Sequence, residues 1–161
     1  MKLRLISSAL LLCIASTVAY AHGDDEGAAI GKPGNAKTVT RTVSVDMSDT
    51  MRFNPSQLTV RSGETIRFVA KNVGKIRHEM MLGTEAGLND HAALMRKFPE
   101  MEHADANAVT VEPGKSAQMI WQFTKAGVVD FACLEPGHYE AGMTGKIAVR
   151  EGGASNEMAA R

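Results

Sequence analysis

Short runs in which apolar and polar residues alternate recur through the middle of this 161-residue chain. The runs are separated by turn signals such as Asn54-Pro55, Ser62-Gly63 and Glu112-Pro113-Gly114. Alternation with period two buries one face of a β-strand, and short strands at roughly 8 to 12 residue spacing are typical of a β-sandwich or barrel. The predicted strands lie around Val39 to Met47, Leu58 to Val60, Ile66 to Ala70, Ala108 to Val111, Ala117 to Phe123, Val128 to Cys133 and Lys146 to Arg150. The pattern therefore predicts an all-β fold.

One segment departs from this pattern. From Asn89 the sequence NDHAALMRKF offers a capping Asn or Asp, good helix formers and a stop at Pro99. We predict a short helix at about residues 90–98, within a helical insertion at about 88–103.

The first 21 residues, MKLRLISSALLLCIASTVAYA, combine two basic residues, an apolar run and a small-residue ending. This is the pattern of a secretory signal peptide, and we expect cleavage after Ala21 and export to the periplasm. A lipid anchor on Cys13 is the alternative, but Leu12 stands where a small residue is needed. Since no other segment has the roughly 20 apolar residues that span a bilayer, we expect no membrane anchor.

Both ends of the remaining chain are rich in Gly, Ala and acidic residues. We expect flexible segments at 22–37 and 151–161 around one domain at 38–150. Loss of Lys2 and Arg4 from a chain with 18 basic and 18 acidic residues leaves a net charge of −2 with neutral His. That charge gives no reason to expect a nucleic-acid partner, and we expect a monomer.

The stretch CLEPGHYEAGM places Cys133, His138 and Met143 at five-residue steps, and His78 begins an apolar run upstream. After cleavage Cys133 is alone, and a lone thiol in an exported protein is buried, paired between chains or bound to a metal. Two imidazoles, a thiolate and a thioether suit copper that cycles between Cu(I) and Cu(II) in a trigonal His2Cys site with a long axial Met. These four residues are therefore candidate copper ligands.

Other interpretations remain open at this point. Taken singly, His78 is typical of a hydrogen-bonded structural histidine, Cys133 of a small buried side chain and Met143 of a core residue. A zinc site would need Glu135 or Glu140 as its fourth ligand, with Met143 facing the core. An exported thiol enzyme would use Cys133 as nucleophile and His138 as base, but no Asn or Asp is assigned to orient that base.

The run RFNPSQLTVRSGETIRFVAKN, followed by His78 and then C-x4-H-x4-M, resembles the cupredoxins, the blue-copper β-sandwich proteins. The resemblance covers about residues 38–150. The segment HAALMRKFPEMEH and the His78-Glu79 pair make the chain most similar to the periplasmic copper-tolerance cupredoxins of the CopI type.

This resemblance implies a Greek-key sandwich with one type 1 copper, held by His78, Cys133 and His138 in the equatorial plane and by Met143 axially. Many cupredoxins have Asn directly after the first His, where its side chain ties that strand to the ligand loop. This chain has Glu79 instead. Its carboxylate could accept the same backbone N–H bonds, and it would add negative charge beside the metal.

A second set of soft ligands raises the prospect of additional, weaker copper binding. His22 would be the mature N-terminus, and His91 and Met95 stand at i and i+4 on one face of the predicted helix, with Met101 and His103 after it. The alternative is a structural helix whose Leu94 and Met95 pack on the sandwich, with His91 and His103 in solvent.

The expected function is periplasmic copper tolerance through a type 1 copper site. A one-electron carrier between periplasmic redox proteins is the alternative. We do not expect an enzyme, and weak Cu(I) oxidation is left open.

Overall fold

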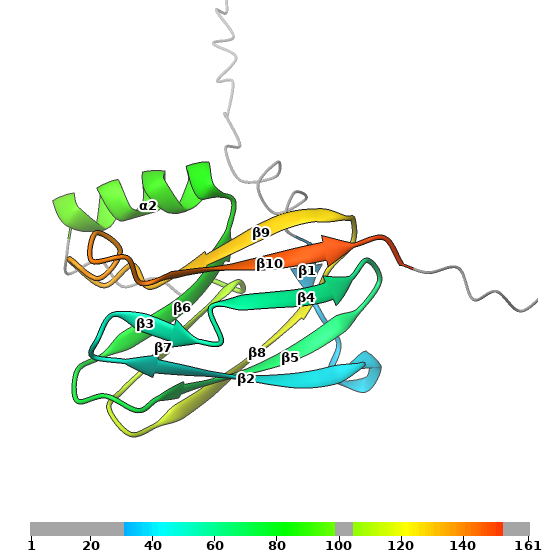
Figure 1. Cartoon of the computed structure of the whole chain (residues 1–161), viewed down its shortest axis with the longest axis horizontal. Coiled ribbons are helices and arrows are strands. Elements are labelled where there is room, and N and C mark those ends of the chain that lie inside the picture. The colour runs from blue at the N-terminus through cyan, green and yellow to red at the C-terminus, as the bar shows by residue number, and fades with distance from the viewer. Residues whose placement is uncertain (1–30, 99–104, 153–161) are drawn as a thin grey trace, which may run out of the picture.

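The computed structural model of this chain describes residues 31–98 and 105–152. Within these ranges the strands form two five-stranded sheets, with the orders β1-β8-β5-β2-β3 and β4-β10-β9-β6-β7 (Figure 1). The elements are β1 (Lys32–Pro33), η1 (Ala36–Thr38), β2 (Arg41–Ser48), β3 (Arg52–Asn54), β4 (Gln57–Arg61), β5 (Thr65–Asn72), β6 (His78–Gly83), α2 (Glu85–Lys97), β7 (Ala108–Val111), β8 (Ser116–Gln122), β9 (Gly127–Ala132) and β10 (Thr144–Arg150). The predicted all-β sandwich is confirmed.

The two sheets enclose one apolar core, and the alternating sequence pattern supplies it. In β10 the buried residues Gly145, Ile147 and Val149 alternate with exposed ones, as expected for a strand with one face in water. Strand β6 differs because it is buried along its whole length. One of its faces meets the core, whereas Met81 on the other face packs in a smaller cluster with the helix.

Helix α2 begins earlier than predicted. Thr84 caps it by accepting a hydrogen bond from the Gly87 N–H at 3.1 Å, and Asn89, the expected cap, lies inside the helix, where its side-chain amide donates to the Glu85 carbonyl. The helix follows β6 almost directly because Gly83 leaves room for Leu88, whose Cγ would lie only 2.7 Å from a Cβ at that position.

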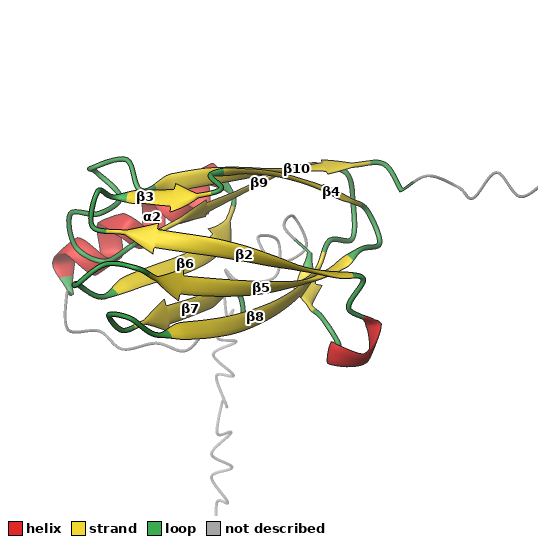
Figure 2. Ribbon diagram, turned by 60° about the horizontal axis from the view of Figure 1, so that its bottom comes forward, coloured by secondary structure: helices red, strands yellow, loops and turns green. Residues whose placement is uncertain are grey.

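Helix α2 lies against β6 and β9 of the sandwich (Figure 2). Leu88 and Ala92 of the helix form a buried cluster with Met81, Ala132 and Leu134. Leu94 was expected to face the sandwich, but its side chain is 39% exposed. That expectation was wrong because Leu88 and Ala92 define the buried face of the helix, and Leu94 stands about 240° around the helix from Leu88 at roughly 100° per residue.

The described structure also begins inside a segment expected to be flexible. Strand β1 pairs antiparallel with β8, and the Gly34 N–H donates to the Ile120 carbonyl at 2.9 Å. The domain boundary expected at residue 38 is therefore too late for residues 32–34. The predicted signal peptide, residues 22–30 and residues 153–161 lie outside the described residues.

Among the described residues, no helix combines the length and apolar character needed to cross a membrane.

The sheet topology brings the ends of several strands together at one end of the sandwich. Strands β2 and β5 are parallel, with Met47 opposite Asn72, so the turn after β2 and the loop after β5 emerge side by side. That loop leads into β6, which pairs antiparallel with β9 so that Met81 lies opposite Ala132. His78 at the start of β6 and Cys133 just after β9 are thereby brought to the same end of the fold.

Candidate metal centre

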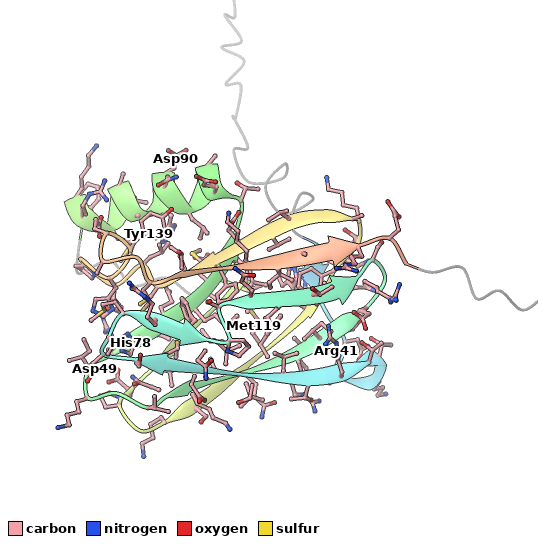
Figure 3. All side chains as sticks on the ribbon, in the orientation of Figure 1. Arg41, Asp49, His78, Asp90, Met119 and Tyr139 are labelled. Carbon is pink, nitrogen blue, oxygen red and sulfur yellow. The ribbon has the colours of Figure 1, made fainter. Side chains whose placement is uncertain are left out.

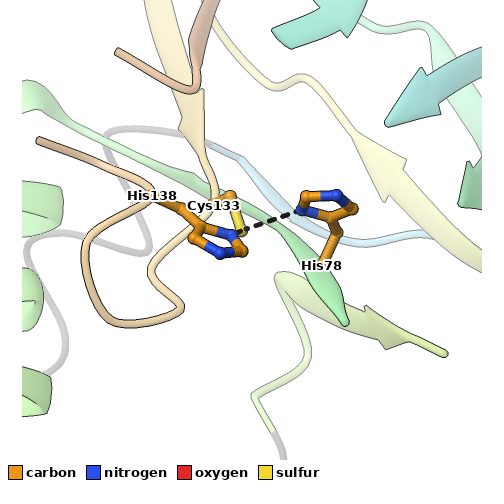
Figure 4. A group of neighbouring side chains, drawn as sticks. All are labelled: His78, Cys133 and His138. Atoms are coloured by element: carbon orange, nitrogen blue, oxygen red, sulfur yellow. Dashed lines mark hydrogen bonds between the residues drawn. The ribbon is translucent and has the colours of Figure 1, made fainter. Parts of the chain in front are cut away.

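Three of the predicted ligands converge at this end of the sandwich. The Cys133 Sγ lies 3.2 Å from His138 Nδ1 and 4.0 Å from His78 Nδ1, and Figure 4 shows both rings turned toward the sulfur. The ring centroids of the two histidines are 5.0 Å apart. All three ligand atoms lie within 4.8 Å of one another, the distance range expected for a shared metal ion.

These separations fit a transition metal in a trigonal plane. Bonds of about 2.0 Å to nitrogen and about 2.3 Å to sulfur, set 120° apart, place the two donor atoms about 3.7 Å from each other. The two measured S···N distances, 3.2 and 4.0 Å, lie on either side of that value. The donor set, two imidazoles and one sulfur, is the one that suits copper.

Cys133 is fully buried, and burial raises the pKa of its thiol to about 12. The backbone N–H groups of Glu79 and Glu135 point at the sulfur, the former at 3.3 Å, and they act in the opposite direction. Without metal the group is therefore a thiol, and metal binding must displace its proton. The two N–H donors then stabilise the bound thiolate.

His138 lies in the loop between β9 and β10 and is half-buried. Desolvation, followed by the nearby His78, lowers the pKa of its imidazole, which favours the neutral ring that binds metals. Since the ring is only partly covered, His138 connects the centre to the molecular surface.

Met143 is fully buried and closes the ligand loop through its backbone. Its N–H donates to the His138 carbonyl, and its carbonyl accepts from the Cys133 N–H, both at 3.1 Å. These two backbone hydrogen bonds therefore hold Cys133, His138 and Met143 close together within one loop.

Arginines from three other elements hold this loop. Arg52 of β3 donates to the carbonyls of Met51 and Ala141 at 2.7 and 3.0 Å. Arg77, before β6, pairs with Glu135, and Arg96 of α2 pairs with Glu140. Both glutamates considered as a fourth zinc ligand are thus engaged in ion pairs with arginines.

A different set of side chains supports His78. Asn72 at the end of β5 donates to the carbonyls of Ile76 and Val111 at 2.7 and 2.9 Å, and it accepts from the Gly74 N–H. Asp49, in the turn after β2, accepts from the Lys75 N–H at 2.8 Å and lies 3.2 Å from His78 Nε2 (Figure 3). The pKa of Asp49 is lowered, chiefly by the Lys75 N–H.

Sequence reasoning missed Asp49 and the three arginines. An Asp between Ser48 and Thr50 indicates a turn, and nothing in the sequence near position 49 points to His78, which lies 29 residues further along.

Glu79 is 7% exposed and follows His78 into β6. Its negative charge contributes to the raised pKa of Cys133. The expectation that its carboxylate accepts backbone N–H bonds from the ligand loop stays a prediction.

The proposed second ligand set is only partly described. His91 and Met95 both lie in α2 and are half-buried, one turn apart. His22, Met101 and His103 lie outside the described residues.

Known proteins that are similar to this chain include copper-binding proteins. Residues 39–150 match the family of copper binding proteins described as the plastocyanin/azurin family. The chain is 57% identical over 135 residues to the copper-resistant cuproprotein CopI of Rubrivivax gelatinosus. The aligned region covers 84% of this chain and 82% of that protein. It is 37% identical to the protein of the same name from Pseudomonas aeruginosa, with 91% of this chain and 94% of that protein covered.

Solved structures of similar fold include two auracyanins. Reduced auracyanin from Roseiflexus castenholzii superposes with a TM-score of 0.59 at 22% identity, covering 69% of this chain and 98% of the other. Auracyanin A from Chloroflexus aurantiacus, described as a "blue" copper protein, gives 0.58 at 23% identity, with coverages of 68% and 98%. At this level of identity the likeness concerns the fold.

Proposed function

This chain belongs to the plastocyanin/azurin family of copper-binding proteins, and we propose that it serves copper resistance as an exported protein with one type 1 copper. His78, Cys133 and His138 would hold the copper, and the thioether of Met143 would supply a fourth, weaker ligand. The observation that carries the proposal is the convergence of one sulfur and two imidazole nitrogens within 4.8 Å. Copper held by this set would supply one-electron exchange between Cu(I) and Cu(II).

The role in copper resistance is supported by the relatives. Both proteins described above carry the name copper-resistant cuproprotein, and their similarity extends over more than four fifths of this chain. Export is supported by the signal-peptide pattern of residues 1–21.

The alternative of a thiol enzyme has less support. A cysteine nucleophile needs a depressed pKa and access for its substrate. The Cys133 side chain has neither property, because it is fully buried and its pKa is raised to about 12.

A growth experiment tests copper resistance. A copper-sensitive bacterial host lacking its own cuproprotein would express either this chain or its Cys133→Ser variant, and growth would be followed as copper rises. We expect protection from the natural chain and none from the variant, because a neutral hydroxyl is a poor copper ligand. Ala132→Ser is the matched control, since it buries a hydroxyl at the neighbouring, equally buried position. Equal protection by all three chains would contradict the proposal.

A one-electron carrier is the second candidate, and the half-buried His138 favours it. Its ring lies 3.2 Å from the Cys133 sulfur and reaches the surface, which offers a short path from the centre to a redox partner. A carrier needs one copper per chain, whereas a protein that buffers copper gains from additional weaker sites.

Copper stoichiometry separates the two roles. We propose that the mature chain binds more than one copper under reducing conditions, using soft ligands among His22, His91, Met95, Met101 and His103. Replacing His91, Met95, Met101 and His103 together should lower the number of bound Cu(I) ions and the copper tolerance of the host, while the colour from Cys133 remains. A stoichiometry of one in the natural chain would instead favour the carrier.

A further inference from the structure

We propose that Asp49 is a positioning residue for the copper centre. Its carboxylate holds the His78 ring so that Nε2 donates to Asp49 and Nδ1 faces the Cys133 sulfur. The inference rests on the proposed copper function, and the test below includes a metal-free measurement that separates the two.

The sheet topology delivers Asp49 to this place. The parallel pairing of β2 with β5 sets Met47 opposite Asn72, and the Val73 N–H donates to the Met47 carbonyl at 2.9 Å. The residues that follow each strand therefore run together, and the turn holding Asp49 lies against the loop that leads to His78.

The carboxylate is seated closely in that loop. One oxygen accepts from the Lys75 N–H at 2.8 Å, and the other lies 3.5 Å from the Ile76 nitrogen. Gly74 is needed at this contact, because a Cβ there would come within 1.8 Å of the Asp49 Oδ1. The loop is thus shaped around the carboxylate, and its position is well defined although the side chain is 39% exposed.

The other partner of this carboxylate is a fully buried imidazole. His78 Nε2 lies 3.2 Å from Asp49 Oδ1, and Nδ1 faces the Cys133 sulfur at 4.0 Å. An ionised carboxylate only accepts hydrogen bonds, so the proton of the neutral ring must be on Nε2, which leaves the lone pair of Nδ1 for a metal. Metal-bound histidines commonly donate their second N–H to a carboxylate or a carbonyl, which fixes tautomer and ring orientation.

The carboxylate also brings charge to the centre. A negative charge hydrogen-bonded to a ligand stabilises Cu(II) more than Cu(I), because the oxidised ion carries the larger positive charge. Asp49 should therefore favour the oxidised form and lower the reduction potential. Because the carboxylate is partly in solvent, the effect is moderate.

Two variants separate these roles from simple turn capping. Asp49→Ser keeps a hydroxyl that caps the turn but is too short to reach His78. Asp49→Asn removes the charge and keeps one of the two acceptor oxygens, so it can accept from the Lys75 N–H or from the His78 ring. Asp46→Asn is the matched control, since it removes the same charge from β2, three residues earlier.

The first measurement uses metal-free protein. Nitrogen NMR of the His78 ring at about pH 9, where imidazoles are neutral, should show only the Nε2–H tautomer in the natural chain. In Asp49→Ser it should show a mixture of both tautomers. This result is independent of whether the protein carries a type 1 copper.

The second measurement is the ratio of Cu(II) to Cu(I) affinity, obtained as the reduction potential of copper-loaded protein. Asp49→Asn should lower this ratio by about tenfold, the smaller end of what outer partners of metal ligands contribute. For a one-electron couple this is a rise of about 59 mV. Asp46→Asn should change the ratio by less than about twofold, as expected for a more distant, screened charge.

Either of two results overturns the proposal: a single Nε2–H tautomer in folded Asp49→Ser, or a potential of Asp49→Asn equal to that of Asp46→Asn. If Asp49→Ser does not fold, the Asp49→Asn potential decides alone. If copper-loaded natural protein lacks a type 1 spectrum, the proposed function fails, and the tautomer measurement still decides the Asp49–His78 contact.

Discussion

The two halves of the metal centre are held in different ways. His78 is the first residue of β6, is fully buried, and is supported by side chains from the turn after β2 and the end of β5. Cys133, His138 and Met143 share one loop, whose backbone groups bond to one another and whose outer surface is held by arginines. The position of His78 therefore depends on contacts between distant segments of the fold, whereas that of the loop residues depends largely on hydrogen bonds within the loop.

The difference predicts where each half is vulnerable. The position of His78 depends on contacts between segments far apart in sequence, so the fold must form before this ligand is in place. The loop ligands keep their spacing through bonds between near neighbours, such as the two that join Met143 to His138 and Cys133. The predictions below compare the halves, beginning with the largest expected effect.

Replacing each histidine by alanine should distinguish a buried ligand from a surface ligand. Both His78→Ala and His138→Ala should lower Cu(II) affinity by at least about 100-fold, more than the loss of an outer partner costs. Added imidazole should restore the colour of His138→Ala, because this ring is half-buried at the surface, and not that of His78→Ala, whose site is closed. Visible absorption during imidazole titration measures this, and equal rescue of both variants would show that the halves are equally accessible.

Met143→Leu tests whether the loop supplies a fourth ligand. We expect copper and colour to be retained and the reduction potential to rise, because loss of the weak axial thioether favours Cu(I). Cyclic voltammetry gives the potential. Met119→Leu, which makes the same change at a buried position in β8, is the control. An equal potential in both variants would place Met143 in the core only.

Glu79→Gln tests the effect of the Glu79 carboxylate, which lies next to His78 in β6. Removing a negative charge close to the centre should raise the reduction potential, because that charge stabilises Cu(II). Voltammetry of the variant beside Glu112→Gln, an exposed position just after β7, separates a local effect from a general one. No difference between the two variants would mean that Glu79 does not act on the copper.

The arginine contacts to the loop should have the smallest effects. Arg52→Ala removes hydrogen bonds to the Met51 and Ala141 carbonyls, and we expect it to lower the free energy of unfolding by about 1 kcal/mol. Arg96→Ala breaks an ion pair whose side chains are 54% and 45% exposed, so we expect less than about 0.5 kcal/mol. Urea unfolding of metal-free protein measures both. A larger loss for Arg96→Ala would mean that the helix, rather than β3, holds the loop.

The same difference explains how much of the protein could be predicted from its sequence. Cys133, His138 and Met143 stand at regular steps, so local spacing together with the family resemblance was sufficient to predict them as candidate ligands. His78 was recognised because it begins an apolar strand after a motif typical of the family. The alternation of apolar residues in β2, β5, β8 and β10 was equally local, and it predicted the sandwich.

What sequence could not give are the contacts between distant segments. Asp49 lies next to His78 only because β2 and β5 are parallel and in register, and neither fact can be derived from a turn sequence. The start of α2 was placed too late because Asn89 and Asp90 look like caps, whereas Thr84 gains the cap position from the close approach of Leu88 to Gly83.

The visible and paramagnetic resonance spectra of the Cu(II)-loaded mature protein test the central claim most directly. If the Cys133 thiolate binds copper beside His78 and His138, the natural chain and Ala132→Ser should show an intense charge-transfer band, and Cys133→Ser should lose it completely. A natural chain without the band, or a Cys133→Ser variant that keeps it, would contradict the assignment of this centre.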